Sequence, residues 1–294
     1  MPQRSWLFVP GDSETKLDKV PSLGADIVIV DLEDAVAPAA KPAARQQAHD
    51  FLARHRQQVT ASGFGRWVRI NALDTPYWRD DLVAVMPAAP QGIMVPKCAG
   101  VEQLQLVSAE LYELEQRAGV QTNTTRLLPL VSETPASALA IGRYADASQP
   151  RLHGLTWGAE DLSSAIGATR KRDAEGGWTD LFRMVRAQTL LTAHARDIAA
   201  IDTLYSDFRD TEGLKRVAEG ARADGFTGML AIHPAQVPVI NAAFTPSDSE
   251  LAHARAVIAA FEASPGSGTV QLDGEMLDQP HLALARRMLG EDAR

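Results

Sequence analysis

Four β-branched residues stand between two aspartates in the stretch Ala25-Asp26-Ile27-Val28-Ile29-Val30-Asp31. An amphipathic strand would alternate apolar and polar residues, but this run is apolar at every position. Such a strand has both faces buried, which is typical of a parallel sheet covered by helices. The stretch therefore predicts an α/β protein built on parallel strands.

Similar short runs recur along the chain and alternate with longer segments of helical spacing. The additional strand-like runs are residues 6–9, 66–70, 92–95, 127–131, 152–157, 198–201 and 228–232. Among the helical segments, an apolar stripe from Val101 to Leu114 precedes Gly119, and residues 212–224 precede Gly225. Eight strands with intervening helices predict a (β/α)8 TIM-type barrel over residues 1–246. An open doubly wound sheet is the alternative, but no G-x-G-x-x-G turn follows any strand.

Residues 247–294 are predicted to form a C-terminal helical and hairpin extension. Ser247 and Glu250 have the spacing of a capping box and open a helix that ends near Ala263. Asp273-Gly274 is a hairpin turn signal between two short strand-like runs, and a last helical segment follows.

Composition limits the classes of partner and the compartment. The net charge is −8 and no block of Lys and Arg is present, which argues against nucleic acid and anionic membranes as partners. No apolar run approaches the roughly 20 residues that span a bilayer. The single cysteine, Cys98, excludes intrachain disulfides and is expected in the core. With no signal-like apolar segment at the start, we expect a cytoplasmic protein.

Two acidic residues, Glu133 and Asp161, each follow a predicted strand. The carboxyl ends of the strands in a parallel barrel converge on one mouth. Two carboxylates that meet there form an oxygen-rich site for a divalent cation such as Mg²⁺. The alternative is that both are solvated loop acids or helix N-caps.

Other charged residues follow neighbouring strands. Asp31, Glu33 and Asp34 end the second predicted strand, and Arg69 lies at the end of the third. The acids could cap the next helix, where the helix dipole favours negative charge. Arg69 could bind an anion or form a salt bridge with the Asp31 cluster, and both readings are open.

Two further polar residues are interpreted as non-catalytic. Ser132 lacks the G-x-S-x-G elbow of hydrolase nucleophiles. His233 lies between a strand and a proline, which favours a structural hydrogen bond over a role as a base.

An ordered set of motifs covers nearly the whole chain and resembles the citrate lyase beta-subunit family of the HpcH/HpaI aldolase superfamily. The motifs are RSWLFVPG (4–11), DLEDAV (31–36), VRIN (68–71), VPK (95–97), LVSET (130–134), GAEDL (158–162), AIHPAQ (231–236) and DGEMLD (273–278). Two positions depart from the family pattern and bear on the substrate. Met229 stands where the family often has lysine, and Ser132 stands where an apolar residue is commoner.

The resemblance implies a Mg²⁺-dependent carbon–carbon lyase, with Mn²⁺ as an alternative ion, acting on a 2-hydroxy acid CoA thioester such as citramalyl-CoA or malyl-CoA. Glu133 and Asp161 would ligate the metal, and Arg69 and Glu133 would contact the substrate. The outer residues that contact metal-bound water would be Asp31, Glu33 and Asp34.

The resemblance also implies that Asp278 is an acid/base in the C-terminal extension, which covers the active site of a neighbouring subunit. That arrangement predicts a homo-oligomer, either a trimer or a hexamer. The candidate side chains for binding the phosphates of coenzyme A are Arg4, Lys16 and Lys97.

Three alternative functions are weighed against this prediction. The first is the beta subunit of citrate lyase proper, which cleaves a citryl thioester on an acyl-carrier subunit within a hetero-complex. The second is a 2-oxo acid aldolase that uses no thioester, against which the extension with Asp278 argues. The third is a non-catalytic CoA-binding paralogue, against which the joint presence of Arg69, Glu133, Asp161 and Asp278 argues.

Overall fold

The structure is a computed structural model that describes residues 3–56 and 63–291. It divides into two compact units, the first ending at Phe244 and the second beginning at Thr245. Each unit has a hydrophobic core of its own.

The first unit is built on one sheet of eight parallel strands in the order β5-β4-β3-β2-β1-β8-β7-β6. Two isolated parallel bridges, Leu127 to Leu152 and Leu130 to Thr156, join the two ends of this order and bring the sheet to a nearly closed barrel. The TIM-type prediction is thereby confirmed. The strands are β1 (Ser5–Pro10), β2 (Ile27–Asp31), β3 (Gly65–Arg69), β4 (Gly92–Val95), β5 (Arg126–Pro129), β6 (Gly154–Thr156), β7 (Ala199–Asp202) and β8 (Gly228–Ala231).

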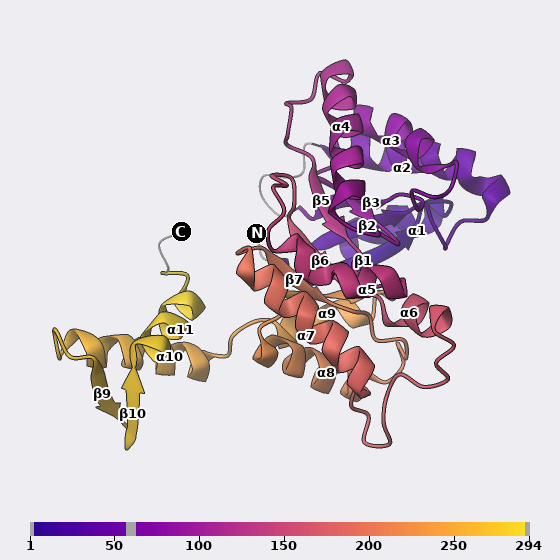
Figure 1. Ribbon diagram of the computed structural model, residues 1–294. Helices are drawn as coiled ribbons and strands as arrows, with labels where there is room; N and C mark the ends of the chain where they lie inside the picture. Colours follow the sequence, from indigo (N-terminus) through magenta and orange to yellow (C-terminus); the bar gives the residue numbers. More distant parts are fainter. Residues whose placement is uncertain (1–2, 57–62, 292–294) are drawn as a thin grey trace. The chain divides into compact units, whose positions relative to one another are not determined.

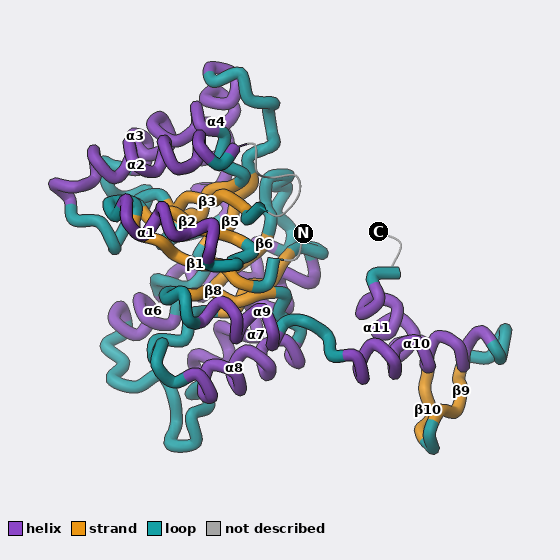
Figure 2. Tube along the Cα trace, turned by 180° about the vertical axis from the view of Figure 1, so that it is seen from behind, coloured by secondary structure: helices purple, strands orange, loops and turns teal. Residues whose placement is uncertain are grey.

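Helices surround these strands, as Figures 1 and 2 show for this unit. The helix α4 ends before Gly119, and α8 ends at Gly225; both glycines have the positive φ that a helix C-terminus often needs. The helices are α1 (Glu14–Lys19), α2 (Lys41–Arg54), α3 (Trp78–Val85), α4 (Val101–Arg117), α5 (Pro135–Ala140), α6 (Ala159–Ala165), α7 (Asp180–Ala195), α8 (Thr211–Asp224) and α9 (Gln236–Ala243).

The side chains of β2 point alternately into the barrel and toward the helices, and both environments are apolar. Ile27 and Ile29 belong to the cluster inside the barrel, together with Trp6 and Trp67. Residues Val28 and Val30 point the other way, into the layer between the barrel and its helices. Water reaches neither face of the strand, since all five of its residues are buried.

The β5–β6 seam is where the predicted strands prove too long. The run 152–157 is reduced to Gly154–Thr156. Leu152 makes only an isolated bridge to Leu127, and its backbone N–H donates to the carbonyl of Gln149 in a turn. A buried ion pair crosses near this seam. Arg151 contacts Glu115 of α4 at 2.7 Å through both terminal nitrogens, and both side chains are fully buried.

Glu115 is held as a carboxylate in this position. Burial alone would raise its pKa, but Arg151 and the backbone N–H groups of Thr125 and Asn123 lower the pKa to about 2. The segment that leads into β5 is thereby tied to both α4 and the start of β6.

The second unit contains α10 (Asp248–Glu262), the antiparallel hairpin of β9 (Thr269–Leu272) and β10 (Glu275–Asp278), and α11 (Gln279–Leu289). The predicted capping box at Ser247 and Glu250 is present. Asp273 and Gly274 both have positive φ, as a two-residue hairpin turn of the primed type requires. In the described part of both units, no helix combines the length and the apolar character needed to cross a bilayer.

The Arg151–Glu115 pair generates a prediction about stability. Replacing Arg151 with Met leaves a buried carboxylate without its counter-charge, which costs about 3–5 kcal/mol of unfolding free energy. Arg117→Met is the matched control, because its pair with Glu113 is exposed on both sides and is worth about 0.5 kcal/mol or less. Urea unfolding of both variants measures the difference. Equal losses would contradict the importance assigned to the buried pair.

Candidate active site

Glu133 lies just beyond β5, at the carboxyl end of the barrel, and its side chain is almost fully buried. The backbone N–H of Lys97, which follows β4, donates to its Oε2 at 2.5 Å. Lys97 adopts a left-handed conformation with φ of 48°. This unusual conformation turns the lysine N–H toward the carboxylate of the neighbouring strand.

The ends of β5 and β6 are fastened together next to Glu133. The backbone N–H of Gly158 donates to the Ser132 hydroxyl at 3.0 Å. A Cβ atom on Gly158 would lie 2.9 Å from Cγ of Glu133, so a larger residue would push the carboxylate aside. The polar serine noted as a departure from the family pattern therefore has a structural partner.

Asp161 lies in the first turn of α6, whose N-cap is Gly158, and the N-cap of α5 is Thr134. Neither Glu133 nor Asp161 is an N-cap, so that alternative is wrong. Lys97 connects the two acids, because its Nζ lies 3.7 Å from Oδ1 of Asp161 while its N–H binds Glu133.

The pKa of Glu133 shows that this part of the site lacks positive charge. Burial raises its pKa first, and the charges of Asp161 and Glu33 raise it further. The hydrogen bond from Lys97 and the charge of that lysine lower it only in part, and the resulting pKa is about 8. The mouth therefore holds more negative charge than its own cations neutralise, which is the condition that favours a bound divalent cation.

The donor set fits a hard cation that keeps positions for other ligands. Across the described chain, no three His, Cys, Asp or Glu side chains converge as a ready-made metal cage. Two carboxylates suit Mg²⁺, which binds through one or two protein carboxylates and completes its coordination with waters and substrate oxygens. Glu133 and Asp161 are the residues that could hold such an ion.

Arg69 is fixed beside this pair. Its Nε and Nη2 contact both oxygens of Asp31, at 2.8 and 2.6 Å, and its Nη1 lies 3.1 Å from Glu33. Burial alone would lower the pKa of Arg69, but Asp31 and Glu33 raise it. The guanidinium also lies over the ring of Phe8. The predicted salt bridge with the Asp31 cluster is present.

The three acids after β2 do not cap the next helix. Asp31 accepts hydrogen bonds from the backbone N–H groups of Glu33 and Ala35, whereas the N-caps of the helical segments that follow are Ala37 and Ala40. Burial raises the pKa of Glu33, although Arg69 and Lys97 counteract it. The acids therefore belong to the charged cluster at the barrel mouth.

Lys97 has a larger place in this cluster than its sequence suggested. Its Nζ lies 2.5 Å from Glu33 and 3.3 Å from Asp34, in addition to its contacts with Glu133 and Asp161. From the sequence, Lys97 was predicted only as a cation that binds the phosphates of coenzyme A. The signal for its wider role was its position one residue after Pro96, at the end of a strand adjacent to β5.

The other two candidate cations lie elsewhere on the first unit. Arg4 precedes β1 and forms a bidentate ion pair with Asp26, which places it at the amino end of the strands. Lys16 is exposed on α1, after the carboxyl end of β1, and makes no ion pair within the described residues. The structure brings neither residue into the acid cluster.

A loop between α6 and α7 carries an aromatic cluster. The guanidinium of Arg172 lies 3.7 Å from the centre of the Trp178 ring, and Trp178 packs edge-on against Trp157 at the end of β6. An ion pair between Lys171 and Glu160 ties the loop to the first turn of α6. This aromatic cluster therefore stands beside the turn that carries Asp161.

Three residues that the sequence pointed to lie outside the acid cluster: His233, Met229 and Cys98. His233 stacks on Phe208 and accepts a hydrogen bond from the Ala235 N–H, in line with the structural interpretation. Met229 is buried in the apolar layer outside the barrel, where a methionine packs without a polar partner. Cys98 is buried in the same layer.

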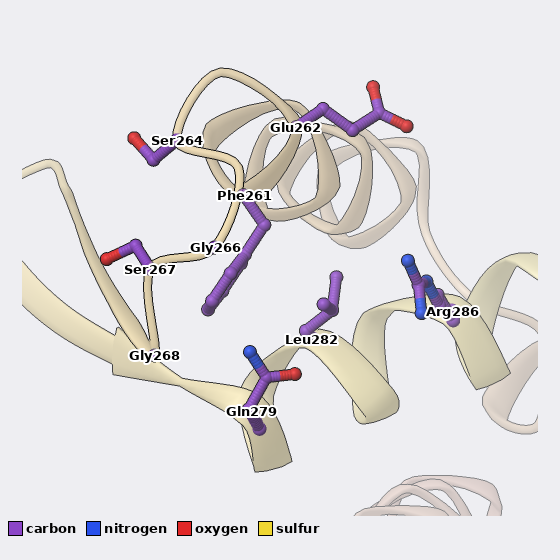
Figure 3. A pocket seen from close by; sticks show the side chains of 9 residues that line it. All are labelled: Phe261, Glu262, Ser264, Gly266, Ser267, Gly268, Gln279, Leu282 and Arg286. Carbon is purple, nitrogen blue, oxygen red and sulfur yellow. The ribbon is translucent and has the colours of Figure 1, made fainter.

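Asp278 belongs to the second unit, where it is the N-cap of α11 and contacts His281. The same helix lines a cavity of about 410 Å³ with Gln279, Leu282 and Arg286, shown in Figure 3. The predicted placement of Asp278 over a neighbouring barrel stays a prediction.

A barrel that gathers carboxylates, an arginine and a lysine at the carboxyl ends of its strands defines an enzyme of the TIM-barrel class. A model of the HpcH/HpaI aldolase/citrate lyase family matches residues 4–234. The chain belongs to this family, and it is an enzyme of the carbon–carbon lyase class.

Relatives with known names are similar over almost the full chain. A (3S)-malyl-CoA thioesterase of Cereibacter sphaeroides is 34% identical over 99% of this chain and 94% of its own length. The mitochondrial citramalyl-CoA lyase of Rattus norvegicus is 32% identical over 98% of this chain and 86% of its own. A crystal structure of CitE from Mycobacterium tuberculosis, in complex with magnesium, acetoacetate and coenzyme A, has a TM-score of 0.78 and 34% identity, covering 99% of this chain and 98% of that one.

The raised pKa of Glu133 predicts a pH-dependent effect on stability without added metal. An acid whose pKa is raised to about 8 by folding stabilises the folded state at low pH, and this contribution is lost as pH rises from about 4.5 to 8. The loss is at most about 1.4 kcal/mol for each pH unit. Glu133→Gln should therefore be more stable than the wild type at pH 8 in EDTA, and about equal at pH 5, in urea unfolding. A variant that is less stable at pH 8 would contradict the assigned repulsion.

Proposed function

We propose that this protein is a Mg²⁺-dependent lyase that cleaves or forms the carbon–carbon bond of a 2-hydroxy acid CoA thioester, such as citramalyl-CoA or malyl-CoA. The products of cleavage would be a 2-oxo acid and an acyl-CoA. The observation that carries the proposal is the buried Glu133, whose pKa is raised by burial and by Asp161 at the barrel mouth. The names of relatives that act on malyl-CoA and citramalyl-CoA support the substrate class.

The chain's own residues have distinct tasks in this proposal. Glu133 and Asp161 would hold the cation, which would supply Lewis-acid polarisation of the oxygen that becomes the carbonyl. Arg69, kept rigid by its two bonds to Asp31, presents its positive charge to the carboxylate of the 2-oxo acid. Asp31, Glu33 and Asp34 would be the outer residues that accept hydrogen bonds from water on the cation.

Lys97 acts on the acids in this arrangement. Its N–H fixes one oxygen of Glu133, and its ammonium lies among Glu33, Asp34 and Asp161. That contact limits the repulsion among four carboxylates that the fold places close together. Lys16, exposed near the end of β1, is the better placed of the remaining cations for a phosphate of coenzyme A; Arg4 is already engaged by Asp26.

The α-carbon of the thioester exchanges a proton in either direction of the reaction. We assign this transfer to Asp278 of the second unit, delivered by a neighbouring subunit of a homotrimer or hexamer. Positioned proton transfer of this kind is worth about 10²–10⁴-fold in rate. In this proposal the acids of the barrel bind the cation or Arg69. A separate group is therefore needed to transfer the proton at the α-carbon.

A coupled assay of the purified chain with malyl-, citramalyl- and citryl-CoA tests the function. Turnover should require Mg²⁺, fall to background in EDTA, and return on addition of Mg²⁺ or Mn²⁺, because the two carboxylates cannot polarise the oxygen by themselves. Glu133→Ala and Asp161→Ala should abolish the response to Mg²⁺. Undiminished rates after exhaustive chelation would refute the proposal.

The same assay separates the rival functions. Turnover of a citryl thioester only on an acyl-carrier protein would favour the beta subunit of citrate lyase in a hetero-complex. No turnover with any thioester would favour a non-catalytic paralogue. The presence of both metal-site acids and Arg69 in one cluster supports an active enzyme.

Asp278→Asn should lower turnover by about 10²–10⁴-fold while the affinity for Mg²⁺ is unchanged, because the substitution removes the transferable proton and leaves the barrel acids intact. Calorimetric titration with Mg²⁺ and steady-state kinetics measure the two effects. Mixing Asp278→Asn subunits with Glu133→Ala subunits should restore part of the activity if the site is shared. No restoration in proven mixed oligomers would contradict the shared site.

A further inference from the structure

The second unit contains a His–Asp pair whose chemistry goes beyond helix capping. Nδ1 of His281 lies 2.6 Å from Oδ1 of Asp278. A proton on Nδ1 would be donated to the carboxylate at such a distance, as in a charge-assisted hydrogen bond. The backbone N–H of Asp278 also points at the same ring nitrogen, at 3.2 Å. Only a ring with a proton on Nδ1 makes the shorter contact a hydrogen bond.

We propose that His281 is a positioning residue for Asp278, which holds the carboxylate in one orientation and shares with it the proton that is exchanged with the substrate carbon. The inference rests on the proposed function and deepens it. In cleavage, the carbon–carbon bond breaks with its electron pair going to the thioester enolate, and the pair gives one proton to the α-carbon. The substrate hydroxyl releases its proton to solvent, from which the pair is protonated again. Condensation reverses each step.

The surroundings of the pair suit this exchange. Both side chains are about half exposed in the single chain, at 51% and 53%, so the second unit leaves the pair accessible to a substrate. The carboxylate is fixed by local structure, because the β9–β10 hairpin ends at Asp278 and α11 begins at the next residue. A proton donor on such rigid elements keeps its geometry better than one on a loop.

Other titratable groups face the same region and must be separated from His281. His281 lines a hollow of about 310 Å³ together with Leu277 and Leu284, and from α10 both Glu250 and His253 line it as well. Glu250 is engaged in the capping box of Ser247. The cavity of Figure 3 is lined by another face of α11, through Gln279, Leu282 and Arg286.

The structural alternative is that His281 only completes the capping box of α11, in which its side chain accepts from the Asp278 N–H. Glutamine serves that purpose in ordinary capping boxes, but it carries no titratable proton. His281→Gln therefore preserves the cap and removes the shared proton. His253→Gln removes a histidine from the same hollow without changing the pair.

The test compares these variants in the full-length protein with Mg²⁺ and the thioester that the wild type turns over. His281→Gln should lower kcat by about tenfold or more, leave KM and the unfolding midpoint unchanged, and alter the pH profile of kcat. His253→Gln should match the wild type. An unchanged kcat and pH profile in His281→Gln would reduce His281 to a helix cap and overturn the inference.

A second measurement does not depend on turnover. Imidazole ¹⁵N spectra of the wild type should show a proton on Nδ1 of His281 near neutral pH, and Asp278→Asn should lose it. If the wild type turns over no thioester but the spectra show this proton, the proposed function fails while the pairing stands. If Nδ1 is unprotonated in the wild type, the shared proton is refuted whatever the activity.

Discussion

The constraint on which the site depends is the concentration of carboxylates at the mouth of the barrel. Glu33 and Glu133 are buried and Asp161 is partly exposed, so the charges of Glu33 and Asp161 act on Glu133 with reduced screening by water. Arg69 and Lys97 offset part of this charge from fixed positions, but the pKa of Glu133 is still about 8. Such uncompensated charge costs folding stability, as is common at functional sites.

The barrel could be predicted because its signal is local. The run from Ile27 to Val30 is apolar on both faces of the strand, and that pattern is typical of a parallel strand with both faces covered, here by the barrel interior and the helices. The glycines after α4 and α8 likewise mark helix ends without knowledge of the tertiary structure. The strand lengths at the β5–β6 seam could not be predicted in this way, because the apolar pattern does not reveal the turn at Gln149 or that Leu152 makes only an isolated bridge.

The site was predictable as a set of acids and an arginine at strand ends, but its internal contacts were not. The left-handed conformation of Lys97 aims its N–H at Glu133, and no propensity of lysine favours that conformation. The Ser132–Gly158 bond joins residues 26 positions apart, on segments that meet only when the barrel closes. In the second unit, the spacing of Asp278 and His281 is that of an ordinary helix cap. The 2.6 Å contact between their side chains could therefore not be predicted from the sequence.

The two proposed metal-site acids flank the least extensive seam of the barrel. The β1–β2 pair has a five-residue register, whereas β5 and β6 are joined through the bridges at Leu127 and Leu130. Other contacts strengthen this seam at both ends: the buried Arg151–Glu115 pair below, and Ser132 with Gly158 above. Glu133 and Asp161 follow these two strands. The distance between the two acids therefore depends on the Arg151–Glu115 ion pair and the Ser132–Gly158 hydrogen bond, because few backbone hydrogen bonds join the strands. A substitution at Arg151, far from the mouth, therefore acts on the same seam that sets the geometry of the proposed cation site.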